Sequence, residues 1–151
     1  MGMAMLLAVE DPSVESARIG DLSAWAELRE RYHPVVVKYL EIAAPTVDPE
    51  TIWERADHAL AVQPVGINPL VWLLRVARES TVEVPDPEST SNPMITSVRR
   101  LPHLQMEVMA LRVAAGLDDA EVAAIIGWPV SRVAAVSQAA LRELMRDREA
   151  A

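Results

Sequence analysis

Cysteine and phenylalanine are absent from the 151-residue chain, and lysine occurs once. Without cysteine the protein has no disulfide bond, no thiolate ligand for zinc and no thiol nucleophile, which is typical of a reducing compartment. The apolar stretch from Met3 to Val9 is too short to span a membrane and lacks the basic flank of a signal peptide. We therefore expect a cytoplasmic protein that does not associate with membranes.

Positive charge is also scarce. The chain has 14 basic and 22 acidic residues, which gives a formal net charge of −8. Residues 1–93 carry 7 basic and 15 acidic side chains, whereas residues 94–151 carry 7 of each. A protein that neutralises several DNA phosphates normally presents a basic surface. Neither half therefore has the composition of a strong, autonomous DNA-binding protein.

Motifs for catalysis and cofactor binding are missing as well. His33, His58 and His103 lie in separate predicted helices and lack the i, i+4 spacing of a metal site. The five glycines form neither a phosphate-binding loop nor a dinucleotide-binding motif, and no serine has the sequence context of a nucleophile. We expect no catalytic residue, no metal ion and no cofactor.

The chain does contain helical periodicity, in segments that prolines separate. A first helix is predicted to start at Asp21 and to end before Pro45. Pro34 lies inside this segment and is expected to kink the helix or to split it in two. No segment alternates between apolar and polar residues as a strand does, so the predicted fold class is all-α.

Two further helices begin at proline-containing start signals. Asp48-Pro49-Glu50 combines a capping side chain, a proline in the first helical position and an acid in the first turn. The helix that it opens should reach about Val62. Asn68-Pro69 repeats the signal and predicts a helix from Leu70 to about Glu79.

The segment after these helices is rich in proline and polar residues, including Pro85, Pro87 and Pro93. Such a composition predicts an extended linker between two small helical domains. The predicted organisation is an N-terminal tail over 1–13, a first domain over 14–81, a linker over 82–96 and a second domain over 97–148.

The second domain has the pattern of a helix-turn-helix. Its first helix is predicted from Val98 to Ala115, with one apolar side formed by Leu101, Leu104, Val108 and Leu111. Gly116 is expected to end that helix in a left-handed conformation, and Asp118 with Glu121 resembles a capping box. The remaining predicted elements are a short helix over 119–126, a turn at Gly127, and a last helix from Pro129 or Val130 to Arg146.

This C-terminal stretch resembles the fourth domain of extracytoplasmic-function sigma factors. Apolar, glycine and charged residues agree with the family in type and spacing over roughly the last 50 residues. The matching residues are Leu101-Pro102, Val108, Leu111-Arg112, Gly116-Leu117, Glu121-Val122-Ala123, Ile125, Ile126-Gly127, Val130, Val133, Ala140 and Leu144. The resemblance implies that the last helix is a recognition helix for promoter DNA.

The N-terminal half is similar to the second domain of the same family. Gly20-Asp21, the run Ala24 to Leu28, and Arg31-Tyr32 with Pro34 match its first helix, and Trp72 to Arg78 matches its late tryptophan helix. The order of the domains also agrees over 14–148. The resemblance implies a regulator of transcription initiation whose partners are core RNA polymerase, promoter DNA, or a sigma or anti-sigma regulator.

Two departures from the family affect the N-terminal half. The residues that the resemblance assigns to polymerase binding are Ile52, Trp53, Glu54 and Arg55, and their acidic-and-amide pattern is altered. Asp57 also stands where the family has an aromatic residue. After Arg78 the family continues with a basic helix that reads and melts the promoter, whereas this chain continues with an acidic, proline-rich sequence.

The recognition helix departs from the family too, because it has few cations. The DNA-binding candidates are Arg99, Arg100, Arg112, Ser131, Arg132, Ala135 and Gln138. Among these, Arg132 has donors that match guanine, and Gln138 has the groups that match adenine. Apolar residues that replace cations, together with a bulky aromatic in the turn, form the protein-interface candidates Trp128, Ala134, Val136 and Ala139.

Two functions remain open from the sequence. One is a sigma-type regulator that directs polymerase to promoters, with weakened binding to DNA and to core polymerase. The other is a sigma-like protein-interaction module, acting as a sigma mimic, as a polymerase modulator or through self-association, which does not bind promoter DNA by itself. A plain helical bundle without a role in nucleic-acid binding would share the pattern, and a small helical enzyme has no motif to support it.

Overall fold

The computed structural model describes residues 22–60, 68–81 and 84–150, and all regular structure within these ranges is α-helical. The predicted all-α fold is therefore confirmed. The helices are α3 (Leu22–Ala43), α4 (Pro49–Ala59), α5 (Pro69–Glu79), α6 (Pro93–Arg99), α7 (His103–Ala115), α8 (Asp119–Ile126) and α9 (Val130–Ala150). The predicted tail over 1–13, the expected cap at Asp21 and the expected end at Val62 lie outside the described residues.

Helix α3 continues through Pro34 as one element, so of the two expected effects of this proline the split into two helices does not occur. The ring of Pro34 lies on the exposed side of α3, where water can hydrogen-bond the carbonyl that the missing N–H leaves free. Leu28, Val36 and Tyr39 are each at most 1% exposed on the other side. Burial of this apolar side outweighs the loss of one backbone hydrogen bond.

The predicted start signals of α4 and α5 are confirmed. The Asp48 carboxylate accepts a hydrogen bond from the backbone N–H of Glu50 at 2.9 Å. The side-chain oxygen of Asn68 accepts from the N–H groups of Leu70 at 2.9 Å and Val71 at 3.2 Å. Both caps satisfy donors that a helix leaves free at its N-terminus, and the prolines occupy first-turn positions that need no N–H.

The predicted helix from Val98 to Ala115 is in fact two helices, α6 and α7. The chain breaks at Leu101-Pro102, because proline disfavours a helical conformation in the preceding residue and has no N–H to donate. Helix α6 begins inside the predicted linker, where Asn92 caps the N–H groups of Met94 and Ile95. Asn92-Pro93 is thus the same start signal as Asn68-Pro69. The domain boundary at residues 82–96 stays a prediction.

The turns on both sides of α8 lie at the predicted glycines, and Gly116 has the predicted left-handed conformation. Gly116 has φ 65° and Gly127 has φ 86°, which is the left-handed region that glycine adopts without steric cost. The capping box is formed in both directions. Asp118 accepts from the N–H of Glu121 at 2.8 Å, and Glu121 accepts from the N–H of Asp118 at 3.0 Å.

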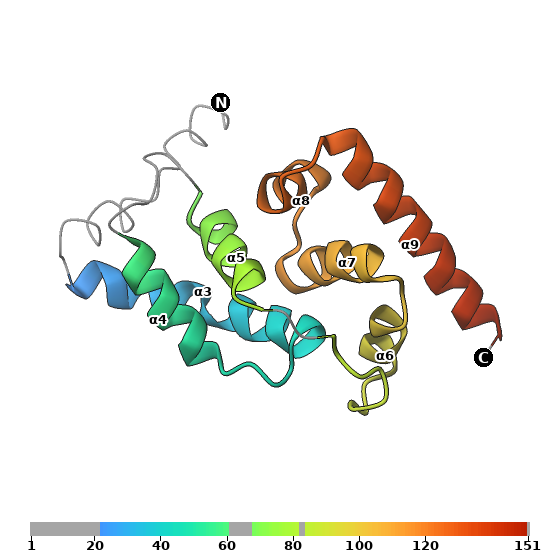
Figure 1. Cartoon of the computed structure of the whole chain (residues 1–151), viewed down its shortest axis with the longest axis horizontal. Helices are drawn as coiled ribbons and strands as arrows, with labels where there is room; N and C mark the ends of the chain where they lie inside the picture. The colour runs from blue at the N-terminus through green and yellow to red at the C-terminus, as the bar shows by residue number, and fades with distance from the viewer. Residues whose placement is uncertain (1–21, 61–67, 82–83, 151) are drawn as a thin grey trace.

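The two halves of the chain share one hydrophobic core. Helix α3 packs on α4 and α5 and also on α6 and α7 of the C-terminal half, and α5 packs on α8. Figure 1 shows α7 at the centre of the C-terminal half, with α8 and α9 beyond it and α9 at the edge of the molecule. Leu104 of α7 is 40% exposed, although the sequence pattern placed it on the apolar side. Leu104 lies in the first turn of α7, where Pro102 and His103 are exposed as well.

No described helix is by itself both long and apolar enough to cross a membrane. Only α8 and α9 taken together reach such a length and composition, and the chain bends by 110° between them.

Candidate protein and nucleic-acid interface

Helix α9 buries one side and exposes the opposite one. Val133, Ser137 and Ala140 are at most 4% exposed and pack toward α7 and α8. The exposed residues include the four that the sequence predicted for the DNA-facing side, namely Ser131, Arg132, Ala135 and Gln138. The recognition face that the resemblance implies is therefore accessible in this fold.

The apolar protein-interface candidates on the same helix are only half-buried. Ala134, Val136 and Ala139 flank the buried side of α9, and Val136 packs against the core. They therefore do not form a fully exposed apolar patch. Trp128, the fourth candidate, is also partly buried against the core, in the turn that precedes α9.

Trp128 forms the platform for an arginine. The guanidinium carbon of Arg132 lies 4.1 Å from the centroid of the Trp128 ring, within the range of a cation–π contact. Trp128 lies in the turn before α9 and Arg132 in the first turn of that helix, and this separation of four residues brings the two side chains together.

Arg99, a predicted DNA-binding residue, is buried and only 7% exposed. Its guanidinium donates to the backbone oxygens of Ile42 at 3.1 Å and Glu41 at 2.6 Å, and to the oxygens of Asp86 and Ser89 at 2.9 Å each. The first two acceptors belong to the last turn of α3, which has free carbonyls and a partial negative charge. Arg99 thus joins α6 to α3 and to the segment before α6, and no phosphate can reach it in this conformation.

The two other arginines outside α9 that were predicted to bind DNA form ion pairs within the chain. Arg100 pairs with Glu88, and the hydrogen bond that its guanidinium donates to this carboxylate raises the pKa of Arg100. Arg112 of α7 pairs with Asp119 at the start of α8. A phosphate would have to compete with these carboxylates, which reduces the charge that the surface offers to DNA.

The seam between the two halves holds polar contacts that the sequence did not predict. Arg75 donates to the backbone oxygen of Ala124 at 2.7 Å. Arg78 donates to the Glu107 carboxylate at 2.7 Å, and His103 lies 3.8 Å from the same carboxylate. Arg75 and Arg78 are 49 and 29 residues away from their acceptors, so no local pattern signals these two contacts.

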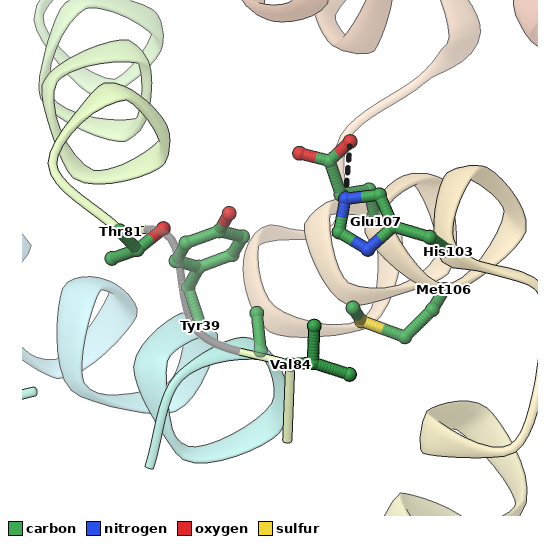
Figure 2. A pocket seen from close by; sticks show the side chains of 7 residues that line it. Tyr39, Thr81, Val84, His103, Met106 and Glu107 are labelled. Carbon is green, nitrogen blue, oxygen red and sulfur yellow. Dashed lines mark ion pairs between the residues drawn. The ribbon is translucent and has the colours of Figure 1, made fainter. Parts of the chain in front are cut away.

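A cavity of about 380 Å³ lies on this seam (Figure 2). Its lining residues are Tyr39, Ala43, Thr81, Val84, His103, Met106 and Glu107. Burial of Tyr39, reinforced by the charge of Glu107, raises the pKa of the Tyr39 hydroxyl. The acid and the imidazole pair with each other, and no three metal-ligating side chains gather anywhere in the described ranges. The cavity therefore offers no reactive constellation that resembles a catalytic site.

The predicted polymerase-binding residues on α4 divide into two pairs. Ile52 and Trp53 are 0% and 1% exposed, whereas Glu54 and Arg55 are exposed. The Trp53 indole N–H donates to Nδ1 of His33 at 3.0 Å. The Trp53 and Trp25 rings meet edge-on, with 5.9 Å between their centroids. Of these four residues, Glu54 and Arg55 alone are accessible to a partner protein in this conformation.

An apolar groove lies between α6 and the end of α9, and the sequence interpretation missed it. The groove measures about 460 Å³ and is lined by Pro93, Met94, Ser97, Leu141, Leu144, Met145, Asp147 and Arg148. Met94, Leu141 and Met145 are 55%, 46% and 63% exposed. The i, i+4 spacing of Leu141 and Met145 indicates an apolar stripe on α9. The opposite wall of the groove was not predicted, because the first residues of α6 lie inside the predicted linker over 82–96.

No known protein family matches the chain, and no curated protein matches it in sequence. Among solved structures, the chain is similar to CnrH, an extracytoplasmic-function sigma factor, in a structure of CnrH in complex with the cytosolic domain of CnrY. The TM-score is 0.82 at 19% sequence identity, and the alignment covers 93% of this chain and 97% of CnrH. The protein therefore has the fold of an extracytoplasmic-function sigma factor.

Proposed function

We propose that the protein is a sigma-factor-like regulator of bacterial transcription initiation. The observation that carries the proposal is the similarity to CnrH over nearly the whole length of both chains, which includes both halves and the helix-turn-helix. The exposed side of α9 supports a DNA contact, because Arg132 and Gln138 bring side chains that hydrogen-bond base edges. In helix-turn-helix proteins the second helix enters the major groove.

The same surface supports only weak binding to DNA. Of the four arginines among the DNA-binding candidates, Arg99, Arg100 and Arg112 already donate to acceptors of this chain. Each phosphate contact that is lost lowers the affinity and its dependence on salt. We therefore expect affinities near those of non-specific binding, about 10⁻⁴–10⁻⁶ M at physiological salt.

A second candidate function is a sigma-like module that acts through protein contacts alone. The paired arginines favour it, as does the apolar groove between α6 and α9. The CnrH structure offers a parallel, because CnrH is in complex there with a domain of a second protein. Both candidate functions include a protein partner, and they differ in whether the chain by itself binds promoter DNA.

The DNA-binding function predicts a gain when a cation is added to the exposed side of α9. In a titration of duplex DNA from about 50 mM salt upward, Ala135→Lys should bind more tightly than the original protein. The slope of log K against log salt should steepen by about 0.9 for the one added phosphate contact. Ala120→Lys, at an exposed position of α8, is the charge-matched control. DNA binding by α9 would be contradicted if the DNA shows no mobility shift at micromolar protein, or if the two lysines change its affinity equally.

The polymerase contact can be tested at the two exposed residues of α4. We expect Glu54→Arg with Arg55→Glu to reduce the fraction of protein that co-elutes with purified core polymerase, because the swap keeps the net charge and reverses its arrangement. Both side chains are exposed, so the fold should be unchanged. Lys38→Glu on the exposed side of α3 serves as the control. Equal co-elution of all three proteins would exclude this surface from the contact.

A further inference from the structure

Arg132 differs from the other three arginines among the DNA-binding candidates, because no residue that the structure describes accepts a hydrogen bond from its guanidinium. Arg99 makes four hydrogen bonds, and Arg100 and Arg112 pair with carboxylates. The Arg132 side chain is exposed, and it makes neither a hydrogen bond nor an ion pair with any residue that the structure describes. Its contact is the ring of Trp128. Arg132 therefore keeps its full donor capacity for a ligand.

The stack on Trp128 orients the guanidinium without using its donors. A guanidinium is planar, and its five N–H groups point outward in that plane. The guanidinium carbon lies over the ring at 4.1 Å from its centroid, and no described residue takes up the N–H groups of this guanidinium. The contact also restricts a long, flexible side chain to fewer conformations before a ligand arrives.

Trp128 is itself held in place. Its backbone N–H donates to the oxygen of Ala123 at 3.2 Å, and the preceding Gly127 has the left-handed φ that closes the turn. The indole is partly buried against the core. Trp128 is thus anchored to α8 through its backbone and to the core through its indole, independently of the Arg132 side chain.

From this geometry we infer that Trp128 is a positioning residue that holds Arg132 for recognition of guanine in duplex DNA; the inference rests on the proposed function. Residues near the start of the second helix of a helix-turn-helix contact base edges in the major groove. Guanine presents two acceptors there, O6 and N7, which match two parallel N–H groups of a guanidinium. Ser131, Ala135 and Gln138 are exposed on the same helix and complete the reading surface.

The test is a selection of duplexes from a randomised DNA library with the full chain at about 50 mM salt. The original protein should enrich guanine at one position of the selected sites, by roughly 5- to 150-fold over the other bases. Arg132→Lys should remove this preference, because an ammonium is a point charge without the planar fork. Trp128→Leu should lower the preference about twofold to fivefold, and Trp128→Phe, which keeps a ring, should retain most of it.

The outcomes separate the inference from the proposed function. If Trp128→Leu weakens binding equally for all sequences, or leaves the guanine preference unchanged, the positioning role is wrong although DNA binding stands. If Arg132→Lys keeps the preference, Arg132 contacts phosphate and not guanine. If the original protein enriches no duplex at micromolar concentration, the DNA-binding function itself fails, and the inference about Trp128 fails with it. Thermal melts of each variant show whether the fold is retained.

Discussion

Replacing Trp53 by alanine is expected to lower the free energy of unfolding by about 3–5 kcal/mol. The indole is 1% exposed, and it lies where α4 meets α3. Its loss leaves a large cavity, removes the edge-on contact with Trp25 and leaves Nδ1 of His33 without its donor. The guanidinium carbon of Arg29, 5.6 Å from the indole centroid, also loses its aromatic surface. Urea denaturation followed by circular dichroism measures the change.

The neighbouring residues provide matched controls on the same helix. Glu54→Ala and Arg55→Ala remove exposed side chains, so each should change the free energy of unfolding by no more than about 0.5 kcal/mol. If Trp53→Ala were as mild as these, Trp53 would be a surface residue, as its assignment to a polymerase contact requires. A large loss of stability would assign Trp53 to the core.

The second large effect is expected at Leu111, which is 0% exposed in the middle of α7. Leu111→Ala should lower the free energy of unfolding by about 2–5 kcal/mol, because α7 packs on α3, α6, α8 and α9 and cannot collapse freely into the space. Since one core joins both halves, we expect a single unfolding transition that shifts as a whole. Differential scanning calorimetry measures both the shift and the number of transitions.

Leu104→Ala is the control for this prediction, because it removes the same side-chain atoms from the same helix. Leu104 is 40% exposed, so Leu104→Ala should cost about 1 kcal/mol or less. Equal losses for the two leucines would contradict the exposure of Leu104 and place it in the core, as the apolar pattern suggested. Two separate transitions would show that the halves unfold independently.

The local features of this chain follow from its sequence. The caps at Asp48 and Asn68, the capping box at Asp118, the left-handed Gly116 and the turn at Gly127 are all confirmed. Each depends on hydrogen bonds or dihedral angles within about four residues, and such interactions are specified by neighbouring side chains. The start of α6 at Asn92-Pro93 was not predicted, because Pro85, Pro87 and the polar residues around them are typical of an extended linker.

The exposed side of α9 was also predictable. The periodicity of α9 separates Val133 and Ala140, which are buried, from Ser131, Arg132 and Gln138, which are exposed. A helix buries one stripe and exposes the opposite one wherever it packs on a core. The stack of Arg132 on Trp128 needed the structure, because the turn sets the direction of the indole.

Sequence by itself determined the all-α class, the helix termini marked by the predicted capping residues, and the exposure of Ser131, Arg132, Ala135 and Gln138 on α9. Only the tertiary structure decided what the cations do. Arg99 resembles a DNA-binding arginine in the sequence, yet its acceptors on α3 lie 57 and 58 residues away. The burial of Trp53 likewise depends on contacts with residues of α3. A capping side chain meets its partner within one turn of helix, whereas a long side chain finds its partner only after the core has brought distant helices together.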